Sequence, residues 1–314
     1  MYSSWGQSLV QGSVARVVIK RFWHHSDHLI SCSFENGVRR IVLNSPKTRH
    51  VHPVLFWFLC FACVLHISNM KKICSRNSLS LEMMKAIQGS LIRDSSNAEL
   101  RAIVISSEGP VFSSGHNLKE LTEKEGREYH QKVFSLCTEM MTAIPKLPVP
   151  VIAKVRGLAA AAGCQLVASC DLVIAGDKAS FSTPGANFGL FCSTPGIAVT
   201  RSMSHKMAAY MLFTGRPITA QEAHVAGLVS RVVPDEKLGK SIPGNYEELE
   251  KMLEDIRNKS RAVIEMGKSF YHQQKELPME HAYRIGEQVM VENLALKDGQ
   301  EGMKAFAEKR KPVW

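Results

Sequence analysis

The chain has 314 residues, of which 45% are hydrophobic and 22% charged, and a formal net charge of +10. Length and composition describe an ordinary soluble globular protein that can bury a full core. The positive charge suggests an anionic partner: nucleic acid, an anionic membrane, or a polyanionic small molecule such as a nucleotide cofactor. We expect no nucleic-acid binding, because the basic residues are spread out and no zinc-finger or RNA-recognition signature accompanies them.

The eight cysteines argue against a secreted disulfide framework, because the chain is long and the cysteines stand inside apolar runs. A reducing compartment fits this pattern better. Cys60 and Cys63 form a Cys-x-x-Cys pair with His66 and Cys74 nearby, but they lie in a hydrophobic run without a second pair at zinc-ribbon spacing. We therefore expect no metal site.

The N-terminal segment is basic, with Arg16, Lys20 and Arg21 before the first acidic residue, Asp27. This composition resembles a mitochondrial transit segment, and a disordered terminus is the alternative; we assign residues 1–35 to one or the other. The most hydrophobic stretch, residues 54–67, is shorter than the roughly 20 residues that a membrane-spanning helix needs. We expect no stable membrane insertion, with a membrane-attached form as the alternative.

From residue 76 onward, the pattern alternates between strands and helices. Residues 77–94 have apolar side chains at helical spacing, with Ser78 or Ser80 as the cap. Apolar runs predict strands over 100–109, 149–159, 170–176 and 179–185. Further helices are predicted over 119–144, from about Ala160, and over 245–260, 279–296 and 299–310. This order predicts an α/β core followed by a C-terminal helical part.

Two strand-to-helix turns, residues 109–121 and 155–166, are rich in glycine, alanine and serine. Small residues let a backbone N–H face a ligand, and the dipole of the following helix favours negative charge there. Two such N–H groups around one oxygen would form an oxyanion hole, in which each donor contributes about 2.7–4 kcal/mol in other enzymes. The alternative is that the small residues only allow close packing of helix on sheet.

The chain resembles the enoyl-CoA hydratase/isomerase (crotonase) family over most of residues 36–48 and 76–314. The resemblance rests on "RRIVLNSPKTR" (39–49), "RNSLSLEMMKAI" (76–87), "FSSGHNLKEL" (112–121), "VPVIAKVRGLAAAAGCQLVASCDLVIA" (149–175), "ASFSTPGANFGLFCSTPG" (179–196), "FTGRPITAQEAHVAGLVSRVVP" (213–234) and "GQEGMKAFAEKRKPVW" (299–314). It implies a spiral of ββα units over 36–234, a C-terminal helical part over 235–314, and assembly as a homotrimer or a pair of trimers. Residues 50–75 interrupt the family pattern as an atypical hydrophobic insertion.

The resemblance also implies a ligand and a site. The ligand would be a coenzyme A thioester, used as substrate without a permanently bound cofactor, in mitochondrial fatty acid metabolism. The backbone N–H groups of His116 and Ala162 fall on the oxyanion-hole positions. The substrate-binding positions are His116, Asn117, Leu118, Lys119, Ala162 and Gly163, where Asn117 is expected to cap or brace the turn. Basic residues for the coenzyme A phosphates would be Lys47, Arg76, Lys119, Lys304 and Lys309.

The catalytic positions depart from the family. The two glutamates that a hydratase of this family uses correspond to Gln165 and Gly185, and neither can transfer a proton near neutral pH. Because positioned acid–base groups contribute 10²–10⁴-fold, we expect no efficient hydration. The polar residues nearby have no evident base, and we expect packing and turn roles for them: Cys164, Ser182, Thr183, Cys192, Ser193 and Thr194. An oxyanion hole without a base could still assist a reaction that chiefly stabilises an enolate.

Two functions follow from this pattern. The first is an acyl-CoA-binding crotonase-family protein with weak or non-hydratase activity. The alternative is a non-catalytic regulator that binds acyl-CoA or a partner enzyme.

Overall fold

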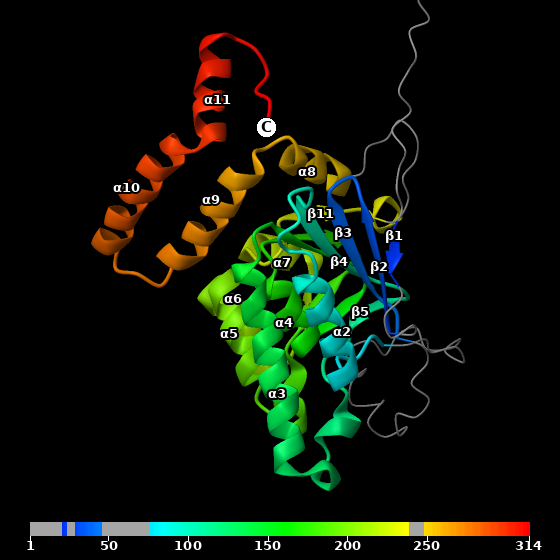
Figure 1. Ribbon diagram of the computed structural model, residues 1–314. Helices are drawn as coiled ribbons and strands as arrows, with labels where there is room; N and C mark the ends of the chain where they lie inside the picture. Colours follow the sequence, from blue (N-terminus) through cyan, green and yellow to red (C-terminus); the bar gives the residue numbers. More distant parts are fainter. Residues whose placement is uncertain (1–20, 24–28, 46–75, 239–247) are drawn as a thin grey trace, which may run out of the picture.

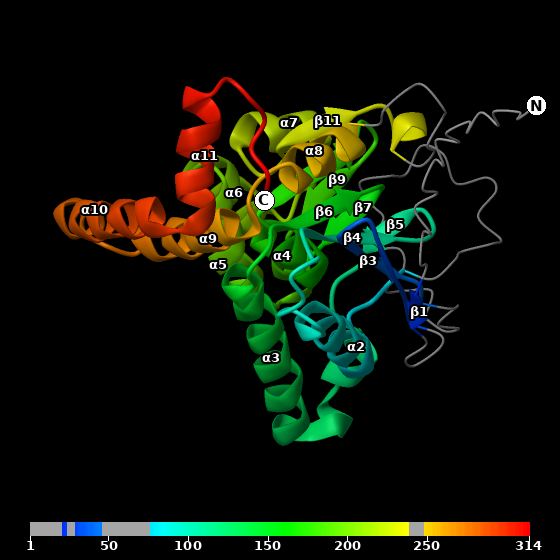
Figure 2. The ribbon, with the colours of Figure 1, turned by 45° about the horizontal axis from the view of Figure 1, so that its top comes forward.

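The strands form two sheets, and consecutive strands of the central part of the chain join them alternately (Figures 1 and 2). The computed structural model describes residues 21–23, 29–45, 76–238 and 248–314. In this part of the chain the larger sheet has seven strands, in the spatial order β1 (Arg21–Trp23), β2 (Ile30–Glu35), β3 (Val38–Leu43), β4 (Ala102–Ser107), β6 (Val151–Val155), β8 (Leu172–Gly176) and β11 (Arg231–Val233). The smaller sheet has four, in the order β10 (Ile218–Thr219), β9 (Ser180–Ser182), β7 (Leu158–Ala160) and β5 (Val111–Ser113).

The chain repeats a ββα unit, as predicted. In each unit the first strand joins the larger sheet, the second joins the smaller sheet, and a helix follows. The units are β4–β5–α3 (Gly126–Ala143), β6–β7–α4 (Ala162–Ser169) and β8–β9–α5 (Ser193–Ser202). Equivalent strands of successive units pair in parallel within each sheet. This arrangement confirms the crotonase-like ββα spiral.

One predicted strand is in fact two. Residues 149–159 were expected to form a single strand, but they divide into β6 of the larger sheet and β7 of the smaller one. The break falls at Gly157, which has φ +67 and passes so close to Pro110 that an added Cβ would stand 1.9 Å from the Pro110 carbonyl oxygen. Only glycine combines this backbone angle with this approach.

Side chains from opposite faces of the larger sheet enter two different apolar clusters. In β4, Ile103 and Ile105 pack with α2 (Leu81–Ile92), α3 and α4, whereas Ala102 and Val104 pack with α8 (Glu248–Arg257). The sheet is therefore covered on both faces, as its continuous apolar strands predicted. Helix α2 begins after Ser80, whose Oγ accepts the Met83 N–H at 3.1 Å, so the predicted cap is confirmed at one of its two candidates.

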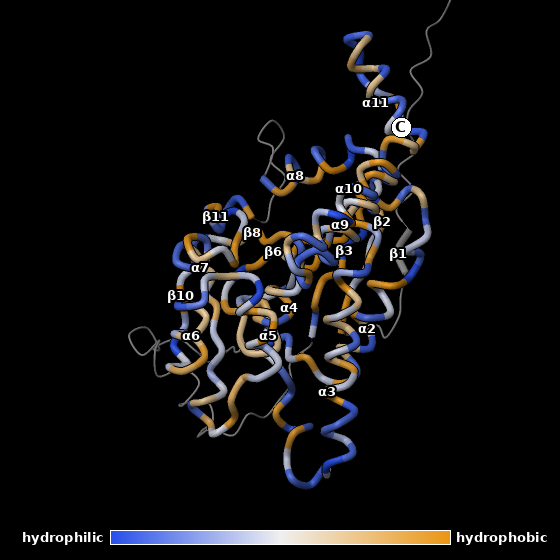
Figure 3. The backbone as a smooth tube through the Cα atoms, turned by 90° about the vertical axis from the view of Figure 1, so that its left-hand side faces the viewer, coloured by the Kyte–Doolittle hydropathy of each residue, from blue (hydrophilic) through white to orange (hydrophobic). Residues whose placement is uncertain are grey.

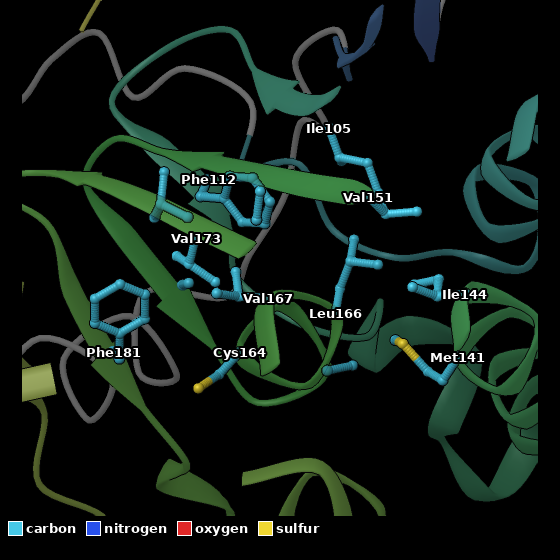
Figure 4. Close-up of a cluster of buried hydrophobic side chains, with 14 of the residues drawn as sticks. Ile105, Phe112, Met141, Ile144, Val151, Cys164, Leu166, Val167, Val173 and Phe181 are labelled. Carbon is cyan, nitrogen blue, oxygen red and sulfur yellow. The ribbon is translucent and has the colours of Figure 1, made fainter. Parts of the chain in front are cut away.

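Helix α4 packs deep in the first cluster and carries the second candidate turn at its N-terminus. Figure 4 shows its side chains among those of neighbouring strands: Cys164, Leu166 and Val167 near Val151, Val173 and Phe181. Full burial of a side chain of this kind contributes roughly 1.5–3 kcal/mol. Figure 3 shows the central strands β6 and β8 as hydrophobic and the outer end of α3 as hydrophilic. Because these buried side chains hold α4 in place, they also fix the position of the turn that precedes it.

Several helices were not predicted from the sequence. They are α5, α6 (His205–Thr214), α7 (Ala220–Ala226) and α9 (Arg261–Gln274). The predicted C-terminal helical part is confirmed, with α8, α9, α10 (Met279–Ala295) and α11 (Lys297–Ala307). Figure 1 shows α10 and α11 standing clear of the body of the molecule.

A buried ion cluster attaches α9 to the core. The Lys268 ammonium donates to Asp171 Oδ2 at 2.6 Å and to the carbonyl of Ile144 at 2.9 Å, and His272 Nε2 lies 2.7 Å from Asp171 Oδ1. Burial lowers the pKa of Lys268, against the opposing effect of Asp171. Burial alone would raise the pKa of Asp171, but hydrogen bonding to His272 and the charge of Lys268 lower it on balance.

Strands β1 and β2 of the larger sheet lie within residues 1–35, the segment predicted to be a transit segment or a disordered terminus. Strand β2 pairs with β3 over Ile30–Glu35, so the folded core begins before residue 36. The proposed transit segment lies mostly outside the described residues, and the insertion at 50–75 lies wholly outside them. The possible metal ligands at 60–74 and the hydrophobic stretch 54–67 fall within that insertion.

Candidate functional site

The two turns predicted to carry chemistry lie against each other. A Cβ added to Gly115 would stand 2.8 Å from the Cβ of Ala161 and 3.2 Å from the backbone nitrogen of Ala162. Gly115 has φ +89, so glycine is required both by its conformation and by the nearness of the second turn. Because His116 follows directly, the amides of His116 and Ala162 belong to neighbouring backbone segments.

Ala161 holds an unusual backbone conformation at this contact. Its φ of +49 and ψ of −120 are rare for a residue with a Cβ and cost roughly 1–3 kcal/mol. Its N–H donates to the carbonyl of Ser182 at 2.9 Å, and its carbonyl accepts the N–H of Gln165 at 2.9 Å. Within the described part of the chain, neither the Ala162 N–H nor the His116 N–H donates a hydrogen bond to another residue.

The helix dipole favours negative charge at only one of the two amides. Ala162 is the first residue of α4, as predicted. His116 instead precedes a short 3-10 helix, η2 (Leu118–Leu121). The helix predicted over 119–144 becomes an α-helix only at Gly126, so no α-helix begins directly after His116. Asn117 caps η2, because its Oδ1 accepts the N–H two residues further on at 3.3 Å. The predicted capping role of Asn117 is confirmed.

The His116 ring is partly buried and uncharged near neutral pH. Its Nδ1 lies 3.3 Å from the carbonyl oxygen of Leu79, which can only accept, so the proton belongs on Nδ1. The ring meets Phe134 edge-on, with centroids 5.3 Å apart. Burial lowers the pKa of His116, although the bond to Leu79 opposes this. Nε2 is buried without a hydrogen-bond partner among the described residues and retains its lone pair.

Gln165, predicted to correspond to the first family glutamate, is a neutral amide in a buried place. Its side chain is 5% exposed and lies on α4, with Oε1 3.9 Å from the sulfur of Cys137 in α3. Burial raises the pKa of Cys137 to about 12, so this thiol is protonated and donates to the amide oxygen. An amide accepts and donates hydrogen bonds but exchanges no proton near neutral pH.

Gly185, predicted to correspond to the second family glutamate, has no room for a side chain. It lies in the 3-10 helix η5 (Pro184–Phe188), and an added Cβ would stand 2.0 Å from the carbonyl oxygen of Leu190 and 2.7 Å from the sulfur of Cys192. The Gly185 N–H donates to that sulfur at 3.2 Å, and the Gly185 carbonyl accepts the Leu190 N–H at 3.0 Å. The loop is closed around the glycine, so a glutamate would require the backbone to move.

The cysteines near these positions are thiols rather than nucleophilic thiolates. Burial, and to a smaller extent Cys192, raises the pKa of Cys164 to about 12, and burial also raises the pKa of Cys192. The Ser182 hydroxyl donates to the carbonyl of Gly215 at 3.4 Å, whereas the Thr183 hydroxyl is buried without a partner in the described residues. None of these groups forms a nucleophile–base pair with a described contact.

The remaining predicted positions have different surroundings. Gly163 lets α4 approach β5, because an added Cβ would stand 2.7 Å from Ser113. Leu118 and Lys119 are exposed in η2. Lys304 lies in α11, which stands at the opposite end of the molecule from the beginning of α3 in Figure 1. Within one chain, Lys304 and Lys309 therefore do not lie beside Lys119. Lys47 lies outside the described residues.

The described residues contain no group of three or more metal-ligating side chains placed to hold an ion. In the same residues, no helix combines the length and apolarity that a bilayer crossing requires.

Comparisons with known proteins agree with this geometry. The sequence model described as enoyl-CoA hydratase/isomerase matches residues 63–314. The chain belongs to the enoyl-CoA hydratase/isomerase family. It is 54% identical over 248 residues to the human protein named enoyl-CoA hydratase domain-containing protein 3, mitochondrial, covering 79% of this chain and 78% of the relative. The Xenopus laevis protein of the same name is 47% identical over 299 residues, covering 94% and 90%.

Solved structures of the family have the same fold. The crystal structure of human enoyl-CoA hydratase domain-containing protein 3 superposes with a TM-score of 0.78 at 47% identity, covering 91% of this chain and all of that one. An enoyl-CoA hydratase from Mycobacterium smegmatis gives a TM-score of 0.77 at 38% identity, covering 91% and 98%. The names of the relatives confirm the predicted mitochondrial location. The family acts on coenzyme A thioesters without a permanently bound cofactor.

Proposed function

We propose that this protein binds acyl-CoA thioesters in mitochondrial fatty acid metabolism, with the N–H groups of His116 and Ala162 holding the thioester oxygen. The observation that carries the proposal is the contact between the two turns at Gly115, together with two N–H groups that donate to no described residue. Buried N–H groups are normally paired, so a pair left free in one place favours a ligand oxygen. The exposed stretch Leu118–Lys119 continues from this point as the substrate-binding segment.

The protein is not an efficient enoyl-CoA hydratase under this proposal. Hydration needs one group to activate water and another to protonate carbon, and Gln165 and Gly185 supply neither. The closed loop around Gly185 supports this reading, because the Leu190 carbonyl and the Cys192 sulfur fill the space where a side chain would begin. Thioester binding depends on backbone groups and is unaffected by these losses.

A non-catalytic role is the second candidate. An acyl-CoA-binding regulator would need the two N–H groups but no acid or base, which agrees with the neutral amide at position 165 and the glycine at position 185. Product formation from any thioester separates this candidate from the first.

We further propose that the chain divides at residue 234 and assembles as a homo-oligomer, a trimer or a pair of trimers. Helices α10 and α11 support assembly, because they expose large apolar side chains that a second copy would bury: Met279, Tyr283, Met290, Val291 and Phe306. Size-exclusion chromatography with light scattering measures the oligomer directly. A monomer at micromolar concentration would contradict this part of the proposal.

Calorimetric titration with a saturated acyl-CoA tests the central claim. We expect binding with a dissociation constant below about 1 mM, and weaker binding of coenzyme A without an acyl group because it lacks the carbonyl oxygen. Absence of binding up to that concentration would overturn the proposal. Rapid hydration of an enoyl-CoA in the same preparation would overturn the claim that hydratase activity is lost.

A further inference from the structure

The peptide group that carries the His116 N–H is held from its other end. The Gly115 carbonyl belongs to the same peptide group and accepts the Leu79 N–H at 2.8 Å. Among the described residues no peptide bond is cis. In a planar trans peptide group the N–H points away from the carbonyl oxygen. The bond from Leu79 to the Gly115 carbonyl therefore fixes the direction in which the His116 N–H points.

The Ser113 side chain holds the preceding peptide group of the same turn. Its Oγ accepts the Gly115 N–H at 3.2 Å and donates to the carbonyl of Asn77 at 2.7 Å. One hydroxyl can make both bonds, because it has one donor and two acceptor lone pairs. Ser113 is 0% exposed, so both bonds are made out of solvent. The peptide groups on the two sides of Gly115 are thus both restrained.

Asn77 gives the Ser113 hydroxyl a fixed acceptor. Asn77 is also 0% exposed, and its Nδ2 donates to the carbonyls of Glu108 at 2.9 Å and Val111 at 2.8 Å. Its Oδ1 accepts the Ser45 N–H at 3.1 Å. Its φ of +45 lies in the left-handed region, which asparagine adopts more readily than most residues. Three side-chain bonds therefore hold the backbone to which Ser113 donates.

Ser113 also lies against the second turn. A Cβ added to Gly163 would stand 2.7 Å from the Cβ of Ser113 and 2.9 Å from its Oγ, so only a glycine backbone can approach this closely. Gly163 directly follows Ala162, just as Gly115 directly precedes His116. One buried side chain is therefore in contact with both backbone segments that carry the N–H groups of the proposed oxyanion hole.

Resting on the proposed thioester binding, we propose that Ser113 is a positioning residue for the oxyanion hole. Its hydroxyl sets the direction of the His116 N–H relative to that of Ala162. Direction matters because a hydrogen bond weakens steeply once the angle at the hydrogen falls below about 120°. A donor held in place before the ligand arrives needs no reorganisation to bind it. Ser113 acts through the backbone, because its hydroxyl is already engaged with Asn77 and Gly115.

Removing the hydroxyl should turn the donor away from the thioester oxygen. Ser113→Ala leaves the Gly115 N–H and the Asn77 carbonyl buried without this partner, which is unfavourable. Rotation of the peptide group before Gly115 relieves this cost and also rotates the next peptide group, which carries the His116 N–H. The variant loses a single oxygen atom from the core, so the fold is retained.

Infrared difference spectroscopy of the full-length protein with a bound acyl-CoA, labelled with ¹³C at the thioester carbonyl, tests this role. Hydrogen bonds to the carbonyl oxygen lower its stretching frequency, so the band reports on the two N–H groups. We expect the band of the bound ligand to lie below its position in water, and to shift back towards that position in Ser113→Ala. Calorimetric titration should show about tenfold weaker binding of acyl-CoA and unchanged binding of coenzyme A without an acyl group.

Ser230→Ala is the matched control. The Ser230 Oγ accepts the Val173 N–H at 3.1 Å in the larger sheet, so this variant loses the same kind of bond at another place. It should lower the free energy of unfolding in urea denaturation and leave the carbonyl band and the acyl-CoA affinity unchanged. Ser113→Cys keeps a weaker donor and acceptor at residue 113, so it should shift the band only part of the way. This second variant also serves if Ser113→Ala does not fold.

The outcomes separate this inference from the proposed function. A band that does not shift in any folded Ser113 variant, with unchanged acyl-CoA affinity, would overturn the positioning role and leave thioester binding intact. A loss of stability without a band shift would show that the hydroxyl is only structural, and would overturn the role in the same way. If the unsubstituted protein binds no acyl-CoA, or binds it with the band at its position in water, both proposals fail.

Discussion

Replacing Gly115 with alanine tests whether the two turns must lie in contact. Residue 115 has φ +89, a conformation that costs a residue with a Cβ roughly 1–3 kcal/mol. The new Cβ would stand 2.8 Å from the Cβ of Ala161 and 3.0 Å from the carbonyl oxygen of Ala160, so the turns must also separate, at roughly 1–3 kcal/mol. We expect Gly115→Ala to lower the free energy of unfolding by roughly 2–6 kcal/mol and to weaken acyl-CoA binding.

Gly126→Ala is the matched control for this variant. Gly126 has φ +77, but nothing lies within 4 Å of its added Cβ, so it carries the backbone cost without the steric one. Urea denaturation of both variants gives the steric contribution as the difference between their free energies of unfolding. Calorimetric titration with acyl-CoA measures whether the affinity of the site has changed. If Gly115→Ala equals Gly126→Ala in both stability and affinity, the contact between the turns has no role and our reasoning about the site fails.

Three further changes have defined outcomes. Ala161→Gly removes an unfavourable positive φ and should raise the free energy of unfolding by about 1 kcal/mol in urea denaturation; a decrease would show that this turn is not strained. Lys268→Met leaves a buried carboxylate without its cation and should cost about 3–5 kcal/mol. Folding lowers the pKa of Asp171, so the stability that its ionised carboxylate contributes is complete above its ordinary pKa and is lost as the pH falls through the lowered pKa. The free energy of unfolding, measured by denaturation, should therefore fall below about pH 4. A free energy that does not change with pH in this range would exclude the contribution of Asp171. Gly185→Glu should cost roughly 1–3 kcal/mol, because its Cβ would stand 2.0 Å from the carbonyl oxygen of Leu190, and should not create hydration of an enoyl-CoA followed by absorbance.

The order of strands and helices could be predicted where local pattern and final packing agree. Helix α2 has apolar residues on one face and a serine cap, and the parallel strands are continuous apolar runs because both sheet faces are covered. The division of β6 from β7 could not be predicted in the same way. It depends on Gly157 meeting Pro110, a residue 47 positions earlier, which no local pattern contains.

The candidate site was predictable in composition but not in its details. Small residues marked both turns, and the two turns lie against each other at Gly115 and Ala161. The convergence of the His116 and Ala162 amides stays a prediction. The closing of the loop on Gly185 by Cys192 was missed, and the glycine-rich and proline-rich sequence between residues 184 and 196 was the available signal. Lys268 was also missed, because its partner Asp171 lies 97 residues earlier and no periodicity connects them.

The two positions predicted to correspond to the family glutamates, 165 and 185, differ in their surroundings. At position 165 the amide has nearly the shape of a carboxylate, so Gln165→Glu would introduce an acid without changing the backbone of α4. At position 185 the backbone itself is closed, because the Leu190 carbonyl and the Cys192 sulfur occupy the space where a side chain would begin. Introducing a carboxylate at residue 185 would therefore require reshaping the loop from 185 to 192, so the absence of a side chain there is a property of the packing around the loop and not of one residue.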